Sequence, residues 1–186
     1  MASNLIFLDM DGVVNSESFY DEWTEAHPGA SFFNEICLKG GIEGFVSPDL
    51  AERFSRLCEA THSIVVWSSS WRMDFEMAGG EFDMDGIRRL WKAKGLPDKR
   101  LVGCTPVISG HRMSYVPRFL EIRKWIDVNA RAFDINRMAV LDDDYDAWRN
   151  DERYDNVVQF QTIWEYGLTE EIADSARRWL NFGECD

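Results

Sequence analysis

The sequence places carboxylates in two short groups that could do chemistry together. Asp9 and Asp11 stand two residues apart and are followed by Gly12, and residues 142–144 are three consecutive aspartates. Two carboxylates on one turning loop allow one to attack an electrophile such as phosphorus while the other moves protons. Adjacent carboxylates repel each other unless a cation lies between them, and oxygen-only ligands suit Mg²⁺. The pattern therefore indicates metal-assisted chemistry on a phosphate.

A third group offers partners for a phosphate. Residues 68–70 are three consecutive serines, and Arg72 follows closely. Hydroxyl groups and a guanidinium are common hydrogen-bond donors to phosphate oxygens. Taken alone, each of the three groups also fits an ordinary turn. A calcium-binding loop that starts at Asp9 would need an acid at Val13 and a glutamate at Tyr20, so that alternative fails.

Each of the three groups directly follows an apolar run, which predicts the elements that position it. Residues 5–8, 64–67 and 138–141 read as buried strands, with weaker strands at 101–102 and 157–158. Helices are expected after Ser47, around 87–93, over 118–129 and after Thr169. Strands that alternate with helices favour a parallel sheet covered on both sides. The carboxyl ends of such strands share one edge, where ligands bind, so the three groups should meet there.

The chain length suits one domain, with a small insertion after the first strand. Residues 15–46 show no sheet periodicity and are rich in aromatics, glycine and acids, so we expect a lid over the active edge. We therefore predict a single catalytic domain over residues 1–186 that contains this lid.

Several motifs resemble one known superfamily. Residues 8–15 (LDMDGVVN) resemble the first motif of the haloacid dehalogenase (HAD) superfamily, residues 66–72 (VWSSSWR) its second and residues 140–144 (VLDDD) its fourth. More specifically, the chain resembles the HAD domains of bacterial Swiss Army knife RNA-repair proteins. That likeness rests on W-x-[ST]-x-W, R-x-x-E-I-x-x-W, L-D-D-D and G-L-T, which occur here at residues 67–71, 118–125, 141–144 and 167–169. It implies an α/β, Rossmann-like three-layer fold with a mainly parallel central sheet.

The resemblance also implies roles for particular residues. Asp9 matches the nucleophile, which would form an aspartyl-phosphate, and Asp11 matches the general acid/base, whose backbone carbonyl also meets Mg²⁺. Asp142 and Asp143 match the metal-binding acids that complete the Mg²⁺ site with Asp9 and Asp11. Ser69 matches the hydroxyl that holds the phosphoryl group. Its neighbours Ser68 and Ser70 stay open as alternatives, and Asp144 and Asp146 could serve only to hold the loop.

The resemblance leaves the phosphate-binding cation and the substrate contacts open. Arg118 matches the third-motif cation, with Arg123 and Lys124 as rivals. Trp71, beside the serines, and Trp23, in the insertion, could stack on a base or belong to the core.

Charge and cysteine content restrict the partners and the compartment. The net charge of −13 argues against a general nucleic-acid binder. However, twelve of the twenty Lys and Arg but only four of the thirty-three Asp and Glu lie between Arg88 and Arg137, so this stretch is +8. It could form an anion-binding surface or a solvated helix face. Four scattered cysteines and an N-terminus without the features of a signal peptide favour a cytoplasmic protein without a membrane segment.

The sequence thus predicts a HAD-type phosphatase, a Mg²⁺-dependent hydrolase of phosphomonoesters. We expect its substrate to be a nucleotide or a nucleic-acid end carrying a 3′-phosphate. A phosphatase of sugars or other small metabolites is the alternative, and a non-catalytic binding module on the same fold is the third hypothesis.

Overall fold

The computed structural model describes residues 3–37, 44–108, 117–149 and 151–185. Residues 38–43 of the expected insertion and Arg112 of the basic stretch lie outside these ranges.

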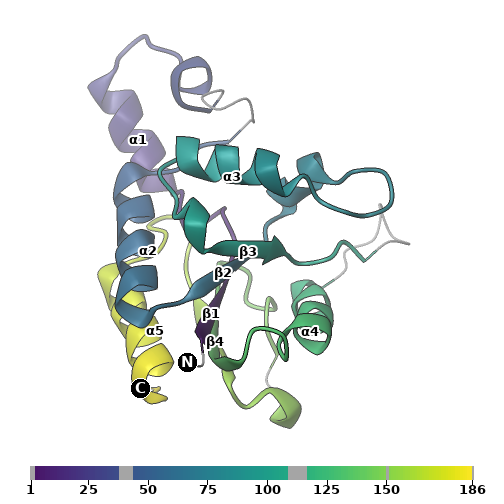
Figure 1. Ribbon diagram of the computed structural model, residues 1–186. Helices are drawn as coiled ribbons and strands as arrows, with labels where there is room; N and C mark the ends of the chain where they lie inside the picture. The colour runs from purple at the N-terminus through teal and green to yellow at the C-terminus, as the bar shows by residue number, and fades with distance from the viewer. Residues whose placement is uncertain (1–2, 38–43, 109–116, 150, 186) are drawn as a thin grey trace.

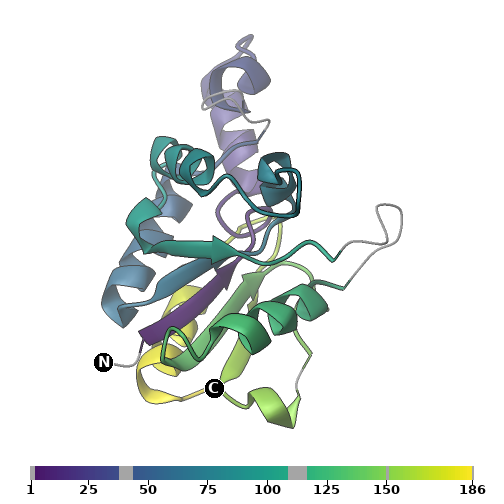
Figure 2. The ribbon, with the colours of Figure 1, turned by 45° about the vertical axis from the view of Figure 1, so that its right-hand side comes forward.

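The centre of the molecule is a five-stranded parallel sheet with the strand order β3-β2-β1-β4-β5. Figure 2 shows the strands pointing to the same side of the sheet. The prediction of a parallel sheet is confirmed, although most strands are longer than the apolar runs suggested. The strands are β1 (Ser3–Leu8), β2 (Ile64–Trp67), β3 (Leu101–Cys104), β4 (Ile135–Asp142) and β5 (Val157–Gln161).

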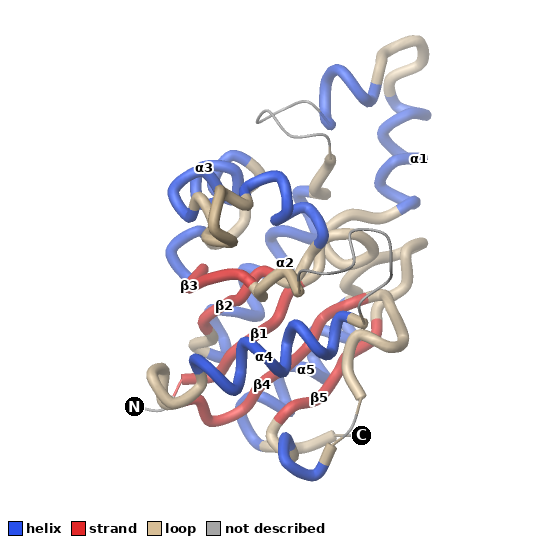
Figure 3. The backbone as a smooth tube through the Cα atoms, turned by 90° about the vertical axis from the view of Figure 1, so that its right-hand side faces the viewer, coloured by secondary structure: helices blue, strands red, loops and turns tan. Residues whose placement is uncertain are grey.

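Helices cover both faces of this sheet. Helices α2 (Pro48–Thr61) and α5 (Glu170–Phe182) pack together on one face, and α4 (Arg118–Asn129) lies on the other (Figures 1 and 3). Helix α3 (Met84–Ala93) lies beside β2 and β3. Ser47 and Thr169 cap α2 and α5 through their side-chain oxygens, as expected from the sequence.

Successive side chains along each strand point to opposite faces of the sheet, so the molecule has two hydrophobic cores. Ile6 and Leu8 face the core shared with α2, α3 and α5, whereas Leu5 and Phe7 face the core shared with α4. All four side chains are fully buried, which explains why β1 reads as an unbroken apolar run. The Rossmann-like three-layer fold predicted from the sequence is therefore present.

The strand register sets the position of the chemical groups. Leu8, the last residue of β1, pairs with Trp67 of β2 on one side and with Leu141 of β4 on the other. Asp9, Ser68 and Asp142 each come one residue later, so they emerge side by side at the carboxyl edge. Backbone bonds continue past this point, because Asp9 N–H donates to the Leu141 carbonyl at 3.0 Å and Ser68 N–H to the Leu8 carbonyl at 2.8 Å.

The segment after β1 carries a helix that the sequence did not reveal. Helix α1 (Glu17–Ala26) begins at Ser16, whose hydroxyl accepts from the Phe19 N–H, and a π-helical turn follows at Phe33–Cys37. Helix α1 projects away from the sheet (Figures 1 and 2). None of its side chains is buried, and its aromatic residues pack within this segment instead of on the sheet.

An aromatic cluster holds this segment together. Phe32, which is buried, makes edge-to-face contacts with Tyr20, Trp23 and Phe45 at centroid distances of 4.9, 5.1 and 4.9 Å. The loop after β5 contacts the start of α1, because the Glu17 N–H donates to the Trp164 carbonyl at 3.0 Å. Within the described ranges, no helix is long and apolar enough to cross a membrane.

Candidate active site

Three carboxylates converge at the carboxyl edge of the sheet. Asp9 follows β1, Asp142 ends β4, and Asp143 follows it, and one oxygen from each lies within 4.8 Å of the others. Asp9 and Asp142 are buried and Asp143 is half-buried. Three such charges cannot share so small a volume without compensation.

Arg118 supplies part of that compensation from the first turn of α4. Its Nη2 lies 3.8 Å from Asp9 Oδ2, and its Nε lies 3.8 Å from Asp142 Oδ2. Of the three cations that the sequence left as rivals, Arg118 is the one that faces these acids. Arg123 instead pairs with Asp151 at 3.3 Å and donates to the Arg149 carbonyl, and Lys124 is exposed.

One guanidinium does not neutralise the cluster. Burial raises the pKa of Asp9 to about 6, although Arg118 acts in the opposite direction. Burial, together with the charge of Asp9, raises the pKa of Asp142 to about 8. Burial also raises the pKa of Asp143. Without a further cation, Asp142 therefore keeps a proton that an ordinary carboxyl group would have released at neutral pH.

The donor set fits a hard divalent cation. All three candidate ligands offer carboxylate oxygens, which Mg²⁺ prefers. The buried Oδ2 of Asp142 accepts no hydrogen bond from the described part of the chain, whereas its Oδ1 accepts from the Asp144 N–H at 2.9 Å. Arg118 Nε lies 3.8 Å from this oxygen, too far for a hydrogen bond, and a buried carboxylate oxygen without a hydrogen bond is costly unless a further partner meets it.

Gly12 allows the two acidic loops to approach each other. Its φ of +68° lies in the left-handed region, and a Cβ at this position would lie 2.5 Å from Asp143 Oδ2. Any larger residue would displace the Asp143 side chain from the cluster.

The side chain of Asp11 is held apart from the three clustered acids. Its Oδ1 accepts from Asn15 Nδ2 at 2.8 Å, and its Oδ2 accepts from Trp71 Nε1 at 3.0 Å. Asn15 in turn accepts from the Gly12 N–H through its Oδ1 at 2.8 Å. The expected contact of Asp11 with a metal through its backbone carbonyl remains a prediction.

The three serines occupy different environments. The Ser69 hydroxyl is buried, contributes a hydrogen bond that counters the pKa rise of Asp9, and accepts from the Trp71 N–H at 3.3 Å. Ser68 Oγ is buried without a partner among the residues described, and Ser70 is exposed. Of the three serines, Ser69 is thus the one that hydrogen-bonds the predicted nucleophile, Asp9.

The guanidinium of Arg72 makes its contacts with other protein groups and does not face the three clustered acids. Its Nε donates to the Thr105 carbonyl at 2.9 Å, its Nη1 donates to the Ser69 carbonyl, and its Nη2 pairs with Glu121. This buried residue therefore ties the ends of β2 and β3 to the first turn of α4, where Arg118 lies one turn from Glu121. Sequence reasoning placed Arg72 among the phosphate partners and overlooked Glu121.

Sequence reasoning also overlooked two hydroxyls at the same edge. Thr105 follows β3 and Thr162 follows β5, and both are fully buried with an Oγ1 that has no partner in the described ranges. The sequence did carry a signal for them, because each threonine directly follows the end of a strand, as Asp9 and Ser68 do.

The described residues of the basic stretch do not form one surface over the site. Arg100 donates to the Ser63 carbonyl and Arg137 to the Leu180 carbonyl, both near the amino ends of the strands. On α3, Arg88 and Arg89 each lie 3.8 Å from an aspartate of the same segment. The positive charge is therefore spread over several elements.

The two tryptophans predicted to stack on a base lie in different places. Trp23 stacks on His27 and contacts Phe32 inside the insertion, whereas Trp71 contacts Asp11. Their base-stacking role remains a prediction.

A comparison with known families agrees with this geometry. The family model described as the HAD domain in Swiss Army Knife RNA repair proteins matches residues 5–173, which confirms the resemblance seen in the motifs. Neither the curated proteins nor the solved structures yielded a match.

The raised pKa values of Asp9 and Asp142 predict a pH-dependent stability. Between about pH 4 and pH 8, the metal-free folded protein holds protons that the unfolded chain has released, so its stability should fall as the pH rises. Thermal melting in chelator should give a lower Tm at about pH 8 than at about pH 5. Saturation with Mg²⁺ to 100 times its Kd should add about 2.7 kcal/mol, or roughly 5–11 °C. At one fixed Mg²⁺ concentration, the stabilisation should be greater at the higher pH, because fewer protons then compete for the carboxylates.

Two variants control this experiment. Asp142→Asn should flatten the pH dependence and remove the Mg²⁺ effect, because the amide carries no charge to compensate. Asp174→Asn removes an exposed acid that pairs with Arg177 on α5, and it should leave both effects unchanged. A metal-free Tm that rises over the same pH range would contradict the charge balance described here.

The Arg72 contacts predict a second stability effect. Arg72→Met should lower the free energy of unfolding by about 3–5 kcal/mol, because Glu121 would be left buried without its partner. The double change Arg72→Met with Glu121→Met should recover part of the loss, as measured by chemical denaturation. A loss below about 1 kcal/mol for Arg72→Met would show that the pair contributes little.

Proposed function

The chain belongs to the family of HAD domains in Swiss Army Knife RNA repair proteins, and on this premise we propose a Mg²⁺-dependent phosphomonoester hydrolase that works through an aspartyl-phosphate on Asp9. Membership of this family implies a HAD-type phosphatase. The observation that carries the finer proposal is the cluster of Asp9, Asp142 and Asp143 with Arg118 beside it.

Asp9 is the nucleophile in this proposal. One of its carboxylate oxygens attacks phosphorus, and the bond from phosphorus to the ester oxygen breaks. Because both the attacking carboxylate and the phosphate are anions, the approach requires positive charge. Arg118 provides one such charge next to Asp9 Oδ2. A Mg²⁺ ion held by Asp9, Asp142 and Asp143 would supply the rest of the charge compensation.

Asp11 handles the protons. It gives its proton to the leaving ester oxygen in the first step. It then takes a proton from a water molecule, whose oxygen attacks the phosphorus of the aspartyl-phosphate while the bond from phosphorus to the Asp9 oxygen breaks. Inorganic phosphate leaves, and Asp9 and Asp11 return to their starting states. Ser69 holds a phosphoryl oxygen in this scheme, which agrees with its contact to Asp9.

We propose a phosphorylated nucleotide or a 3′-phosphate at a nucleic-acid end as the substrate. The family description, which refers to RNA repair, supports this class. The net charge of −13 and the scattered basic residues argue against extended contact with a long polymer. Recognition should therefore be limited to the terminal few nucleotides.

The nucleophile is tested by Asp9→Asn. The amide has nearly the same shape but cannot attack phosphorus, so turnover should fall by at least a thousandfold while the fold is retained. Steady-state hydrolysis of a phosphomonoester in Mg²⁺, with circular dichroism as the folding control, measures both. Activity within tenfold of wild type, or full wild-type activity in excess chelator, would exclude this scheme.

The substrate class is tested by a comparison of kcat/KM. A nucleoside 3′-phosphate and a short 3′-phosphorylated oligonucleotide should exceed a sugar phosphate by about fivefold to over a hundredfold, as expected for roughly 1–3 kcal/mol from one stacked base. The preference should level off after a few nucleotides. A sugar phosphate that exceeds every nucleotide would replace this proposal with a metabolite phosphatase.

A further inference from the structure

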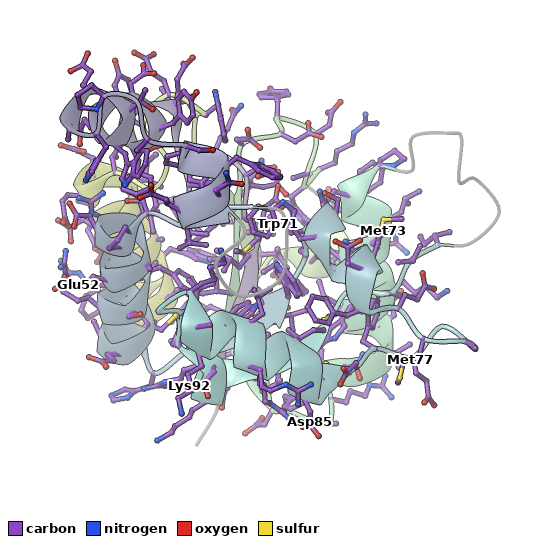
Figure 4. All side chains as sticks on the ribbon, turned by 90° about the horizontal axis from the view of Figure 1, so that it is seen from above. Glu52, Trp71, Met73, Met77, Asp85 and Lys92 are labelled. Carbon is purple, nitrogen blue, oxygen red and sulfur yellow. The ribbon has the colours of Figure 1, made fainter. Side chains whose placement is uncertain are left out.

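The indole of Trp71 is fixed by contacts from three separate segments. Its Nε1–H donates to Asp11 Oδ2 at 3.0 Å, and its backbone N–H donates to Ser69 Oγ at 3.3 Å. The backbone at Gly44 lies against the six-membered ring, since a Cβ at Gly44 would lie 2.2 Å from the ring atom Cη2. Seen from above, Trp71 lies near the centre of the molecule while Lys92 and Asp85 of α3 lie nearer its rim (Figure 4).

The contact with Trp71 determines how the Asp11 carboxylate is oriented. Asn15 holds only Oδ1, and a single hydrogen bond leaves the carboxylate free to rotate, because its terminal torsion has a broad energy profile. The indole N–H holds the other oxygen, so the two donors together fix the plane of the group. An indole N–H can only donate, so this contact has one possible direction.

We propose that Trp71 is a positioning residue that aims the Asp11 carboxylate at the leaving oxygen. The proposal rests on the function proposed above, in which Asp11 is the general acid/base. Proton transfer requires the acid within hydrogen-bond reach of the leaving oxygen, and a misplacement of about 1 Å can cost a hundredfold in rate. Trp71 thus affects the rate of proton transfer through its hydrogen bond to Asp11, and no contact with the substrate is required.

The insertion after β1 takes part in this arrangement through Gly44. The Gly44 carbonyl accepts from Lys94 Nζ at 2.9 Å, which anchors this backbone to the end of α3. The anchored backbone keeps the indole in the position where its N–H meets Asp11. The face of the ring that lies against Gly44 is consequently closed to a substrate base.

The variant Trp71→Phe separates positioning from base stacking, because phenylalanine keeps an aromatic face but has no N–H. On a nucleoside 3′-phosphate, kcat should fall by roughly tenfold to a hundredfold while KM stays within about twofold. The first turnover of p-nitrophenyl phosphate should change by less than about threefold, since this leaving group needs little protonation. An unchanged kcat on the nucleoside phosphate would overturn the proposal. A raised KM with kcat retained would assign Trp71 to stacking instead.

A matched control and a double variant make the result specific. Trp91→Phe removes another buried indole N–H, one that has no partner in the described ranges, and should leave kcat within about twofold of wild type. In an Asp11→Asn background, adding Trp71→Phe should cause no further loss, because the group to be positioned is already inactive. Multiplying losses would contradict the proposal. If Asp11→Asn alone keeps full activity, the proposed acid/base role fails first.

A spectroscopic test does not depend on turnover. In nitrogen-15-labelled protein, the indole resonance of Trp71 is identified by its absence in Trp71→Phe. This resonance should move in Asp11→Asn and in Gly44→Ala, whose added methyl group would collide with the ring. It should stay in place in Asp174→Asn, which lies on α5. A resonance that does not respond to Asp11→Asn would show that the hydrogen bond is absent in solution and would overturn the proposal.

Discussion

The repulsion among buried carboxylates is the constraint on which the rest of this structure depends. Asp9, Asp142 and Asp143 meet within 4.8 Å at the end of the sheet, and Arg118 alone faces Asp9 and Asp142 among the described cations. Burial raises the pKa of all three acids, the charge of Asp9 raises that of Asp142 further, and Arg118 offsets these effects only in part. An arrangement of this kind weakens the folded state, which marks this edge as a candidate functional site. The Mg²⁺ ion that we propose would supply the missing positive charge.

The fold meets this constraint with contacts that each hold one part of the edge. The pairing of Leu8 with Trp67 and Leu141 sets Asp9 beside its neighbours, and Gly12 lets the first loop approach Asp143. Arg72 joins two strand ends to α4, and so steadies the turn that carries Arg118. These contacts hold the charged groups in place, and in the reaction that we propose such pre-organisation would lower the cost of reorganisation.

The sequence predicted the parts of the structure that follow from local patterns. The apolar runs before Asp9, Ser68 and Asp142 were sufficient to predict the parallel sheet and the edge where these residues meet. The helix over 118–129 was predicted with its observed bounds. Helix α1 was missed, because its aromatic residues pack on Phe32 within the insertion and produce no stripe facing the sheet. The contacts of Arg72 with Glu121 and of Trp71 with Asp11 join residues about fifty and sixty positions apart, and no local pattern encodes them.

The most direct test of the central claim is chemical trapping of the aspartyl-phosphate on Asp9. Borohydride reduces an acyl phosphate to an alcohol and leaves free carboxylates intact. Enzyme quenched during turnover, reduced and digested should therefore yield a peptide in which position 9 is homoserine, identified by mass spectrometry. The account predicts this product in wild type and its absence in Asp9→Asn. Full turnover with an unmodified Asp9, or reduction at another acid, would contradict it.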